Sequence, residues 1–254
     1  MPKKKFKLIP EAHLLLFREN RIWMEIYIRN SDGKRNRKMN TVIFDLDGTL
    51  SDSAEGIIRS INYALPKLGF EEHPKKELLQ YIGPHLNIIF ERLTGVNDED
   101  FLLKAITTFR ERYFSIGYKE NELYEGIRKV LELLTERGDI LCIATTKRTD
   151  IAMNVLKYFK INNFFTQVKG SDLYPDKADL LRDMAGDNTL NYRPMIMIGD
   201  RDSDFIAASK AGIRSLGVRW GYGNDDELRH ATAVVERPED LPEAIVQYAG
   251  RVIL

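Results

Sequence analysis

Two hydrophobic patterns alternate along most of this chain. Short runs of consecutive apolar residues are typical of buried strands, whereas apolar residues that recur every three or four positions are typical of amphipathic helices. Strands are predicted at residues 42–44, 140–144, 164–168, 195–198, 215–218 and 234–235. Helical spacing separates most of the later strands, and this alternation is typical of a parallel sheet that helices cover on both faces. The sequence therefore predicts an α/β fold.

Residues 52–120 break the alternation, because every periodic stretch in them is helical. Helical spacing runs from 54 to 68, from 75 to 93 with an interruption at Gly83 and Pro84, and from about 98 to 114. No strand-like run separates these stretches. We therefore expect a small helical cap domain at 52–120, inserted after the first strand of a core domain that comprises 39–51 and 121–254. Such an insert can act as a lid.

The first 38 residues differ from the rest in charge. They carry 11 Lys and Arg against 4 Asp and Glu, which leaves 27 against 34 for the remainder. Two strand-like runs at 12–17 and 22–28 are compatible with a hairpin, followed by a basic linker. Segment 5–21 resembles the opening hairpin of Nudix hydrolases, but the Gly- and Glu-rich catalytic box of that family is absent. We expect a basic N-terminal extension at 1–38 and carry over no Nudix activity.

Composition excludes several classes of partner. The formal net charge of the 254 residues is zero, so no overall field attracts nucleic acid or an anionic membrane. No apolar run approaches the roughly 18 residues of a membrane helix, and the start at Lys3 lacks the apolar core of a secretory signal. The single cysteine, Cys142, lies in an apolar run and suits a reducing compartment. We expect a cytoplasmic monomer or homodimer that binds neither nucleic acid nor membrane.

The first predicted strand ends in a group of polar residues that suits a metal ion. Asp45 and Asp47 follow the apolar run at 42–44, and Gly48 follows them. Side chains alternate along a strand, so the two carboxylates point to the same side. Mg²⁺ takes oxygen ligands and keeps room for water and a substrate phosphate. An isolated Asp-x-Asp-Gly segment also occurs in ordinary surface turns. Other segments of the chain must therefore distinguish a metal site from a turn.

Other predicted strands also end in polar residues. Thr145 and Thr146 follow the run at 140–144, a second acidic segment at 200–204 follows the run at 195–198, and Lys177 opens a helix. In an open parallel sheet the carboxyl ends of the strands share one crevice. Taken singly, Thr145 would more often be a helix cap and Lys177 a solvated helix start. Together, these positions predict one site.

The four polar segments, in this order, resemble the motifs of the haloacid dehalogenase superfamily of phosphohydrolases. The resemblance spans residues 41–248 and implies a Rossmann-like core with a helical cap between the first two motifs. Residues 45–50, Thr145, Lys177 and 199–204 match motifs one to four in turn. Segments 54–58, 81–84, 144–147 and 220–223 are most similar to phosphoglycolate phosphatase-type members.

The resemblance implies a Mg²⁺-dependent phosphatase, and general chemistry gives each residue a role. We expect Asp45 to attack phosphorus and form an aspartyl phosphate that water then cleaves. Asp47 would protonate the leaving group and later activate water, while by resemblance its backbone carbonyl also binds Mg²⁺. Mg²⁺ would bridge Asp45, Asp200 and a phosphate oxygen. Lys177 would supply a fixed cation.

The remaining positions and functions stay open at this point. Thr145 and Thr146 would bind phosphate oxygens, and Asp204 would be a helix cap or a support behind the metal ligands. The expected substrate is a small phosphorylated metabolite, such as phosphoglycolate or a nucleoside monophosphate. One alternative is a phosphotransferase of mutase type on the same scaffold, with Arg92 and Lys104 as candidates for substrate contact. A non-catalytic phosphoacceptor module is another.

Overall fold

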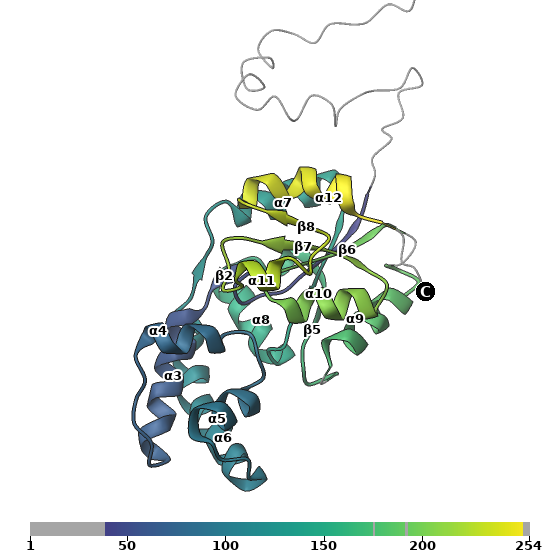
Figure 1. The fold of residues 1–254 in the computed structure, drawn as a ribbon. Helices are drawn as coiled ribbons and strands as arrows, with labels where there is room; N and C mark the ends of the chain where they lie inside the picture. The colour runs from purple at the N-terminus through teal and green to yellow at the C-terminus, as the bar shows by residue number, and fades with distance from the viewer. Residues whose placement is uncertain (1–38, 175, 191–192, 251–254) are drawn as a thin grey trace, which may run out of the picture. The chain divides into compact units, whose positions relative to one another are not determined.

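A computed structural model describes residues 39–174, 176–190 and 193–250 (Figure 1). The predicted hairpin and the Nudix-like segment lie outside these residues. Within them, six strands form one sheet in the order β5-β4-β1-β6-β7-β8, and every neighbouring pair is parallel. The strands are β1 (Thr41–Phe44), β4 (Ile140–Ala144), β5 (Phe165–Lys169), β6 (Met195–Gly199), β7 (Arg214–Val218) and β8 (Ala233–Val235).

Strand β1 lies inside the sheet and is buried along its whole length. Its alternating side chains join two hydrophobic clusters, because Val42 and Phe44 pack into one and Ile43 packs into the other. A strand buried on both faces reads as a continuous apolar run, and this is why 42–44 shows no polar alternation.

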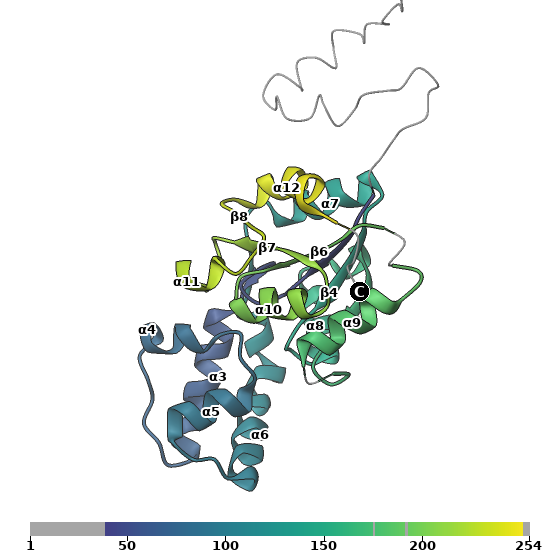
Figure 2. The same ribbon diagram turned by 45° about the vertical axis from the view of Figure 1, so that its right-hand side comes forward.

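Helices cover both faces of the sheet, as the alternating pattern predicts. Helices α7 (Ile127–Arg137), α8 (Thr149–Tyr158) and α12 (Leu241–Tyr248) contribute to the cluster that holds Phe44. Helices α9 (Lys177–Gly186) and α10 (Asp202–Lys210) contribute to the cluster that holds Ile43. Figures 1 and 2 show α7 beside α12, with α9 and α10 across the sheet from them. This arrangement confirms the expected α/β fold.

Three further elements that follow β4 along the chain are short. They are η4 (Asn162–Phe164), α11 (Asp225–Leu228) and η5 (Pro238–Asp240). No helix in the described part of the chain is both long and apolar enough to cross a membrane.

The helices between the first two core strands pack around a hydrophobic cluster of their own. We call this part, from α3 to η3, the helical insert, and Figure 2 shows its main helices grouped to one side of the sheet. Phe90, Phe109 and Tyr113 lie in its cluster, together with Ile151 from core helix α8. Its elements are α3 (Ala54–Lys67), α4 (Lys75–Leu78), η2 (Leu79–Tyr81), α5 (Leu86–Thr94), α6 (Glu99–Ser115) and η3 (Gly117–Lys119).

One pair of short strands was not predicted from the sequence. Strands β2 (Ser51–Asp52) and β3 (Glu122–Leu123) pair antiparallel where the chain enters and leaves the insert, and two residues are too few to show a periodic pattern. Helix α10 begins at Asp202, within the acidic segment at 200–204, where the Asp204 side chain accepts a hydrogen bond from the Arg201 N–H. The division into core and cap domains stays a prediction.

Candidate active site

The register of the three central strands brings two predicted site segments beside Asp45. Phe44 is paired with Ile143 of β4 and with Ile198 of β6, so all three strands end at the same level. Asp45, directly after β1, donates its N–H to the Ile198 carbonyl over 2.8 Å. Thr145 and Asp200 directly follow β4 and β6. The carboxyl edge of the sheet thus gathers three of the segments that the sequence singles out.

Lys177 joins this group from the first turn of α9. Its ammonium lies 2.5 Å from Asp204 Oδ1 and 3.2 Å from Asp45 Oδ1, and all three side chains are buried. Although the pair with Asp45 is close, no donor among the described residues is aligned with Asp45 Oδ1 for a hydrogen bond. Lys177 therefore stabilises two carboxylates by charge and leaves lone pairs of Asp45 open.

Asp200 is fixed from both sides and enclosed by backbone. Its Oδ1 accepts a hydrogen bond from the Thr49 hydroxyl at 3.2 Å, and its Oδ2 accepts one from the Tyr222 N–H at 2.8 Å. Gly48 has φ +81°, and a Cβ there would lie 2.2 Å from Asp200 Oδ2. A Cβ at Gly221 would lie 2.3 Å from that of Asp200. Glycine is needed at these positions because the turns pack directly against the carboxylate.

The site holds more buried carboxylate than buried ammonium. Burial, with the charges of Asp204 and Asp47, raises the pKa of Asp45 to about 6, although Lys177 opposes the shift. Burial and the charges of Asp204 and Asp45 likewise raise the pKa of Asp200 well above its usual range. Such a cluster favours a bound cation, since a cation would stabilise the ionised form of each carboxylate.

Asp47 has a different partner. Its Oδ2 lies 2.9 Å from the ammonium of Lys147, in the loop that follows β4. That ammonium also donates to the Tyr113 hydroxyl of α6 at 2.9 Å. Burial tends to lower the pKa of Lys147, but the charge of Asp47 and the contact with Tyr113 outweigh it and raise the pKa. Lys147 is therefore held as an ammonium between the core and the helical insert.

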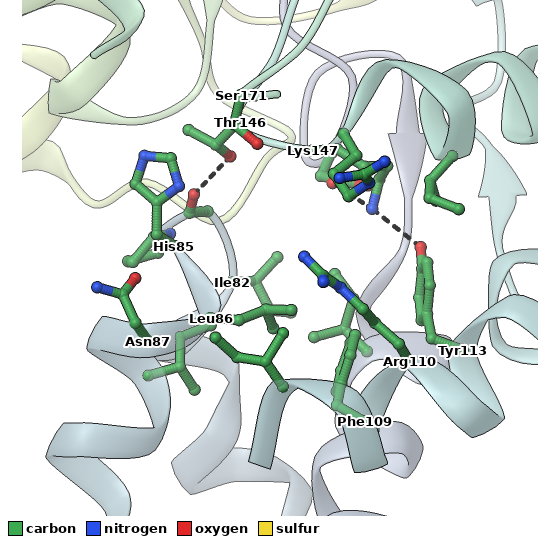
Figure 3. Close-up of a pocket in the computed structure, with 18 of the residues that line it drawn as sticks. Ile82, His85, Leu86, Asn87, Phe109, Arg110, Tyr113, Thr146, Lys147 and Ser171 are labelled. Atoms are coloured by element: carbon green, nitrogen blue, oxygen red, sulfur yellow. Dashed lines mark hydrogen bonds and ion pairs between the residues drawn. The ribbon is translucent and has the colours of Figure 1, made fainter. Parts of the chain in front are cut away.

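A cavity of about 180 Å³ lies beside this contact (Figure 3). Asp47, Thr146 and Lys147 line it from the core, while Arg110 and Tyr113 line it from α6. Figure 3 shows the Arg110 side chain extending from the helix toward the middle of the cavity. Other lining residues, largely apolar, come from the insert and include Tyr81, Ile82, Leu86, Ile89, Ile106 and Phe109.

Most predicted site residues thus lie at one edge of the sheet. Thr145 is buried there, and its hydroxyl oxygen accepts a hydrogen bond from the Lys147 N–H at 3.3 Å. Thr146 lines the cavity and donates its hydroxyl to the Gly83 carbonyl at 2.9 Å. Arg92 and Lys104 are exposed and do not line the cavity, so the suggestion that they contact substrate has no support in this structure.

The sequence analysis did not assign roles to Thr49, Arg110, Tyr113, Lys147 and Tyr222. Lys147 carried a usable signal, because it follows Thr145 and Thr146 at a strand end. Arg110 and Tyr113 carried none, since the side of α6 that faces the core depends on packing between distant segments.

The residues present suit a divalent metal ion. One carboxylate oxygen from each of Asp45, Asp200 and Asp204 lies within 4.8 Å of the others. Both oxygens of Asp204 already accept hydrogen bonds, from Lys177 and from the Arg201 N–H, which fits a residue that supports the ligands. An all-oxygen donor set is typical of sites for hard cations such as Mg²⁺ or Ca²⁺.

The parallel sheet and its acidic carboxyl edge define a doubly wound α/β protein, and comparison with known proteins identifies its family. Residues 42–218 match the haloacid dehalogenase-like hydrolase family. The chain belongs to this family, as its motifs indicate. The chain is 38% identical over 191 residues to a protein named 5'-nucleotidase from Pseudomonas aeruginosa, covering 74% of this chain and 86% of the relative.

Further relatives carry other names. A phosphoglycolate phosphatase from Vibrio cholerae is 28% identical over 77% of this chain and 91% of its own length. A protein named tyrosine-protein kinase PtkA from Mycobacterium tuberculosis is 33% identical, over 80% of this chain and 70% of its own. The crystal structure of a predicted phosphatase from Clostridium acetobutylicum superposes with a TM-score of 0.77 at 34% identity, covering 82% of this chain and 99% of that one. These findings confirm the expected enzyme class, a phosphatase of this family.

Proposed function

We propose that this enzyme hydrolyses a small phosphorylated metabolite in two steps, with Asp45 as the nucleophile and Mg²⁺ as the bound metal. The observation that carries the proposal is the position of Asp45. Its carboxylate lies 3.2 Å from the ammonium of Lys177, in a buried acidic cluster with Asp200 and Asp204, and one of its oxygens has no aligned donor. A nucleophile needs an open lone pair and a nearby positive charge to hold the phosphate.

Asp45 and Asp200 would hold the Mg²⁺, with the backbone carbonyl of Asp47 as a third protein ligand and Asp204 behind them. Bound there, the ion would neutralise charge on the transferring phosphoryl oxygens. Lys177 would hold the same phosphate through its fixed ammonium, and Thr145 would donate its hydroxyl to a further oxygen. The chain has a single cysteine, which suits a cytoplasmic location, where thiols stay reduced.

In the first step, a lone pair of Asp45 forms a bond to phosphorus as the bond between phosphorus and the leaving oxygen breaks. Asp47 enters this step as the carboxylic acid and gives its proton to that leaving oxygen, so the product departs as an alcohol. In the second step, Asp47 takes a proton from water, and the water oxygen attacks phosphorus. The bond between Asp45 and phosphorus breaks, which releases inorganic phosphate and restores both carboxyl groups.

The cavity beside Asp47 is the place for the leaving group. Within it, Lys147 is paired with Asp47, and Arg148 is paired with Asp150 at 3.2 Å. Arg110 forms neither an ion pair nor a hydrogen bond among the described residues, and burial together with the charge of Arg148 lowers its pKa. The charge of Asp150 opposes this shift, but Asp150 forms no ion pair with Arg110. A cation in the cavity without an ion-pair partner favours a leaving group with an anionic substituent, as in phosphoglycolate, over a neutral nucleoside.

A second candidate function is transfer of the phosphoryl group from Asp45 to an acceptor other than water. The relative named tyrosine-protein kinase PtkA favours it. The two functions differ in their products, because hydrolysis releases one inorganic phosphate for each ester cleaved. Product analysis with an acceptor present separates them.

Asp45→Asn tests the proposed nucleophile. The amide has no carboxylate lone pair to form an acyl phosphate, so phosphate release from p-nitrophenyl phosphate with Mg²⁺ should fall by at least about 10³-fold. Asp202→Asn is the control, because Asp202 lies in the same acidic segment outside the metal cluster and should keep activity. A wild-type protein inactive on a broad panel of phosphate esters would contradict the function itself.

Mg²⁺ should stabilise the folded protein in a manner that depends on pH. A metal binds the ionised carboxylate, and the pKa of Asp45 is raised to about 6, so binding is strong above that pH and weakens as the pH falls through it. At about pH 7.5 and 100 times the dissociation constant, stabilisation is about 2.7 kcal/mol, or a Tm higher by roughly 5–10 °C. At about pH 5 the dissociation constant should be about 10-fold larger, so the stabilisation should fall by about half, to roughly 1.4 kcal/mol. An equal shift at both pH values would contradict the site.

Arg110→Met tests the choice of substrate. Loss of a charge-assisted contact should raise KM for phosphoglycolate by about 10-fold or more, with KM for a nucleoside monophosphate within about 3-fold of wild type. Arg92→Met is the matched control, an exposed arginine of the insert outside the cavity. Equal losses on both substrates would show that Arg110 does not select for an anionic leaving group.

A further inference from the structure

Lys147 lies at a junction that the two-step reaction alone does not explain. Its side chain is only 10% exposed, and its ammonium lies 2.9 Å from Asp47 Oδ2 and 2.9 Å from the Tyr113 hydroxyl. It also lies 4.7 Å from the centre of the Tyr113 ring, within the range of a cation–π contact. One buried cation therefore contacts both the proposed proton-transfer group and the helical insert.

Lys147 is the main restraint on the Asp47 side chain. The other carboxylate oxygen of Asp47, Oδ1, is buried and has no hydrogen-bond partner among the described residues. A general acid must be held within hydrogen-bond reach of the atom that it protonates. With Lys147 absent, the Asp47 carboxyl would lose its ion pair and could rotate away from the leaving oxygen.

The insert supplies the other half of the restraint. Tyr113 is buried on α6, and its ring stacks on Phe109 at 5.2 Å with an interplanar angle of 16°. A neighbouring contact also joins the two parts, because Thr146 of the core donates its hydroxyl to the Gly83 carbonyl of the insert. Lys147 can bridge Asp47 and Tyr113 only while α6 lies against the loop that follows β4.

We propose that Lys147 is a positioning residue that, through Tyr113, aims Asp47 at the leaving oxygen only while the helical insert is docked on the core. The inference rests on the proposed function, in which Asp47 is the general acid. The step affected is breakage of the bond between phosphorus and the leaving oxygen, in which the electron pair goes to that oxygen and the proton comes from Asp47. Attack by Asp45 needs no help from Lys147.

The test compares phenyl phosphate with p-nitrophenyl phosphate. The two esters have the same charge and nearly the same size, but phenolate leaves far less readily than p-nitrophenolate without a proton. The quantity to compare is kcat/KM, because it covers only the steps up to departure of the leaving group. The later role of Asp47 toward water then does not enter the comparison.

Lys147→Met should lower kcat/KM for phenyl phosphate by about 10–100-fold and for p-nitrophenyl phosphate by less than about 3-fold. Tyr113→Phe, which keeps the ring and removes the hydroxyl, should show a weaker form of the same selective loss. Lys147→Arg should restore part of the activity toward phenyl phosphate. Lys104→Met is the control, since Lys104 is an exposed lysine on the same helix, α6.

Three outcomes overturn the inference. A loss of equal size on both esters indicates a merely structural role, and no loss on either indicates no role. In the double variant Lys147→Met/Asp47→Asn, the two losses should not add, because residues that act through one another are not additive. Fully additive losses would show that Lys147 does not act through Asp47. A wild type that cleaves neither these two esters nor any member of a broad panel of phosphate esters would contradict the proposed function rather than the positioning role. If Lys147→Met does not fold, the same comparison of kcat/KM on the two esters is made with Tyr113→Phe.

Discussion

Attraction between two buried ammonium groups and a cluster of buried carboxylates is the interaction on which the site depends. Lys177 stabilises Asp45 and Asp204, and Lys147 stabilises Asp47. A buried, unpaired carboxylate costs several kcal/mol, so this acidic edge could not persist without those ammonium groups. Burial, together with the remaining negative charge, raises the pKa of Asp45 and of Asp200, and a divalent metal would neutralise that charge.

The fold holds these charged groups close to one another. Strand β1 is buried between β4 and β6, and the shared register of the three makes their carboxyl ends coincide. The register of the strands therefore brings together the polar residues directly after each strand, independently of the conformation of the loops that follow. The helical insert is added through the short β2 and β3 pair, which lets it carry side chains of α6 to the cavity without altering the sheet. The sheet edge thus supplies the proposed reacting groups, and the insert supplies part of the cavity wall beside them.

The strands of the sheet and the polar residues at its carboxyl edge could both be predicted from the sequence, because each depends on a local pattern of residues. An apolar run that ends in polar residues marks a strand and its carboxyl end at once, and this located Asp45, Thr145 and Asp200. The cavity was not predictable in the same way, because which residues of α6 face the core depends on packing between segments far apart in the chain. For that reason the sequence offered Arg92 and Lys104 as candidates for substrate contact, although neither lines the cavity. Nothing local distinguishes them from Arg110, which does line the cavity.

The central claim is that Asp45 carries the phosphoryl group, and trapping the intermediate tests it most directly. In Asp47→Asn, cleavage of the aspartyl phosphate should slow, while p-nitrophenolate still leaves readily. The protein is incubated with p-nitrophenyl phosphate and Mg²⁺, quenched, reduced with borohydride and analysed by peptide mass spectrometry. The account predicts homoserine at position 45, since borohydride reduces an acyl phosphate to the alcohol. Substrate turnover with no modification at Asp45, or with the modification at another carboxylate, would contradict it.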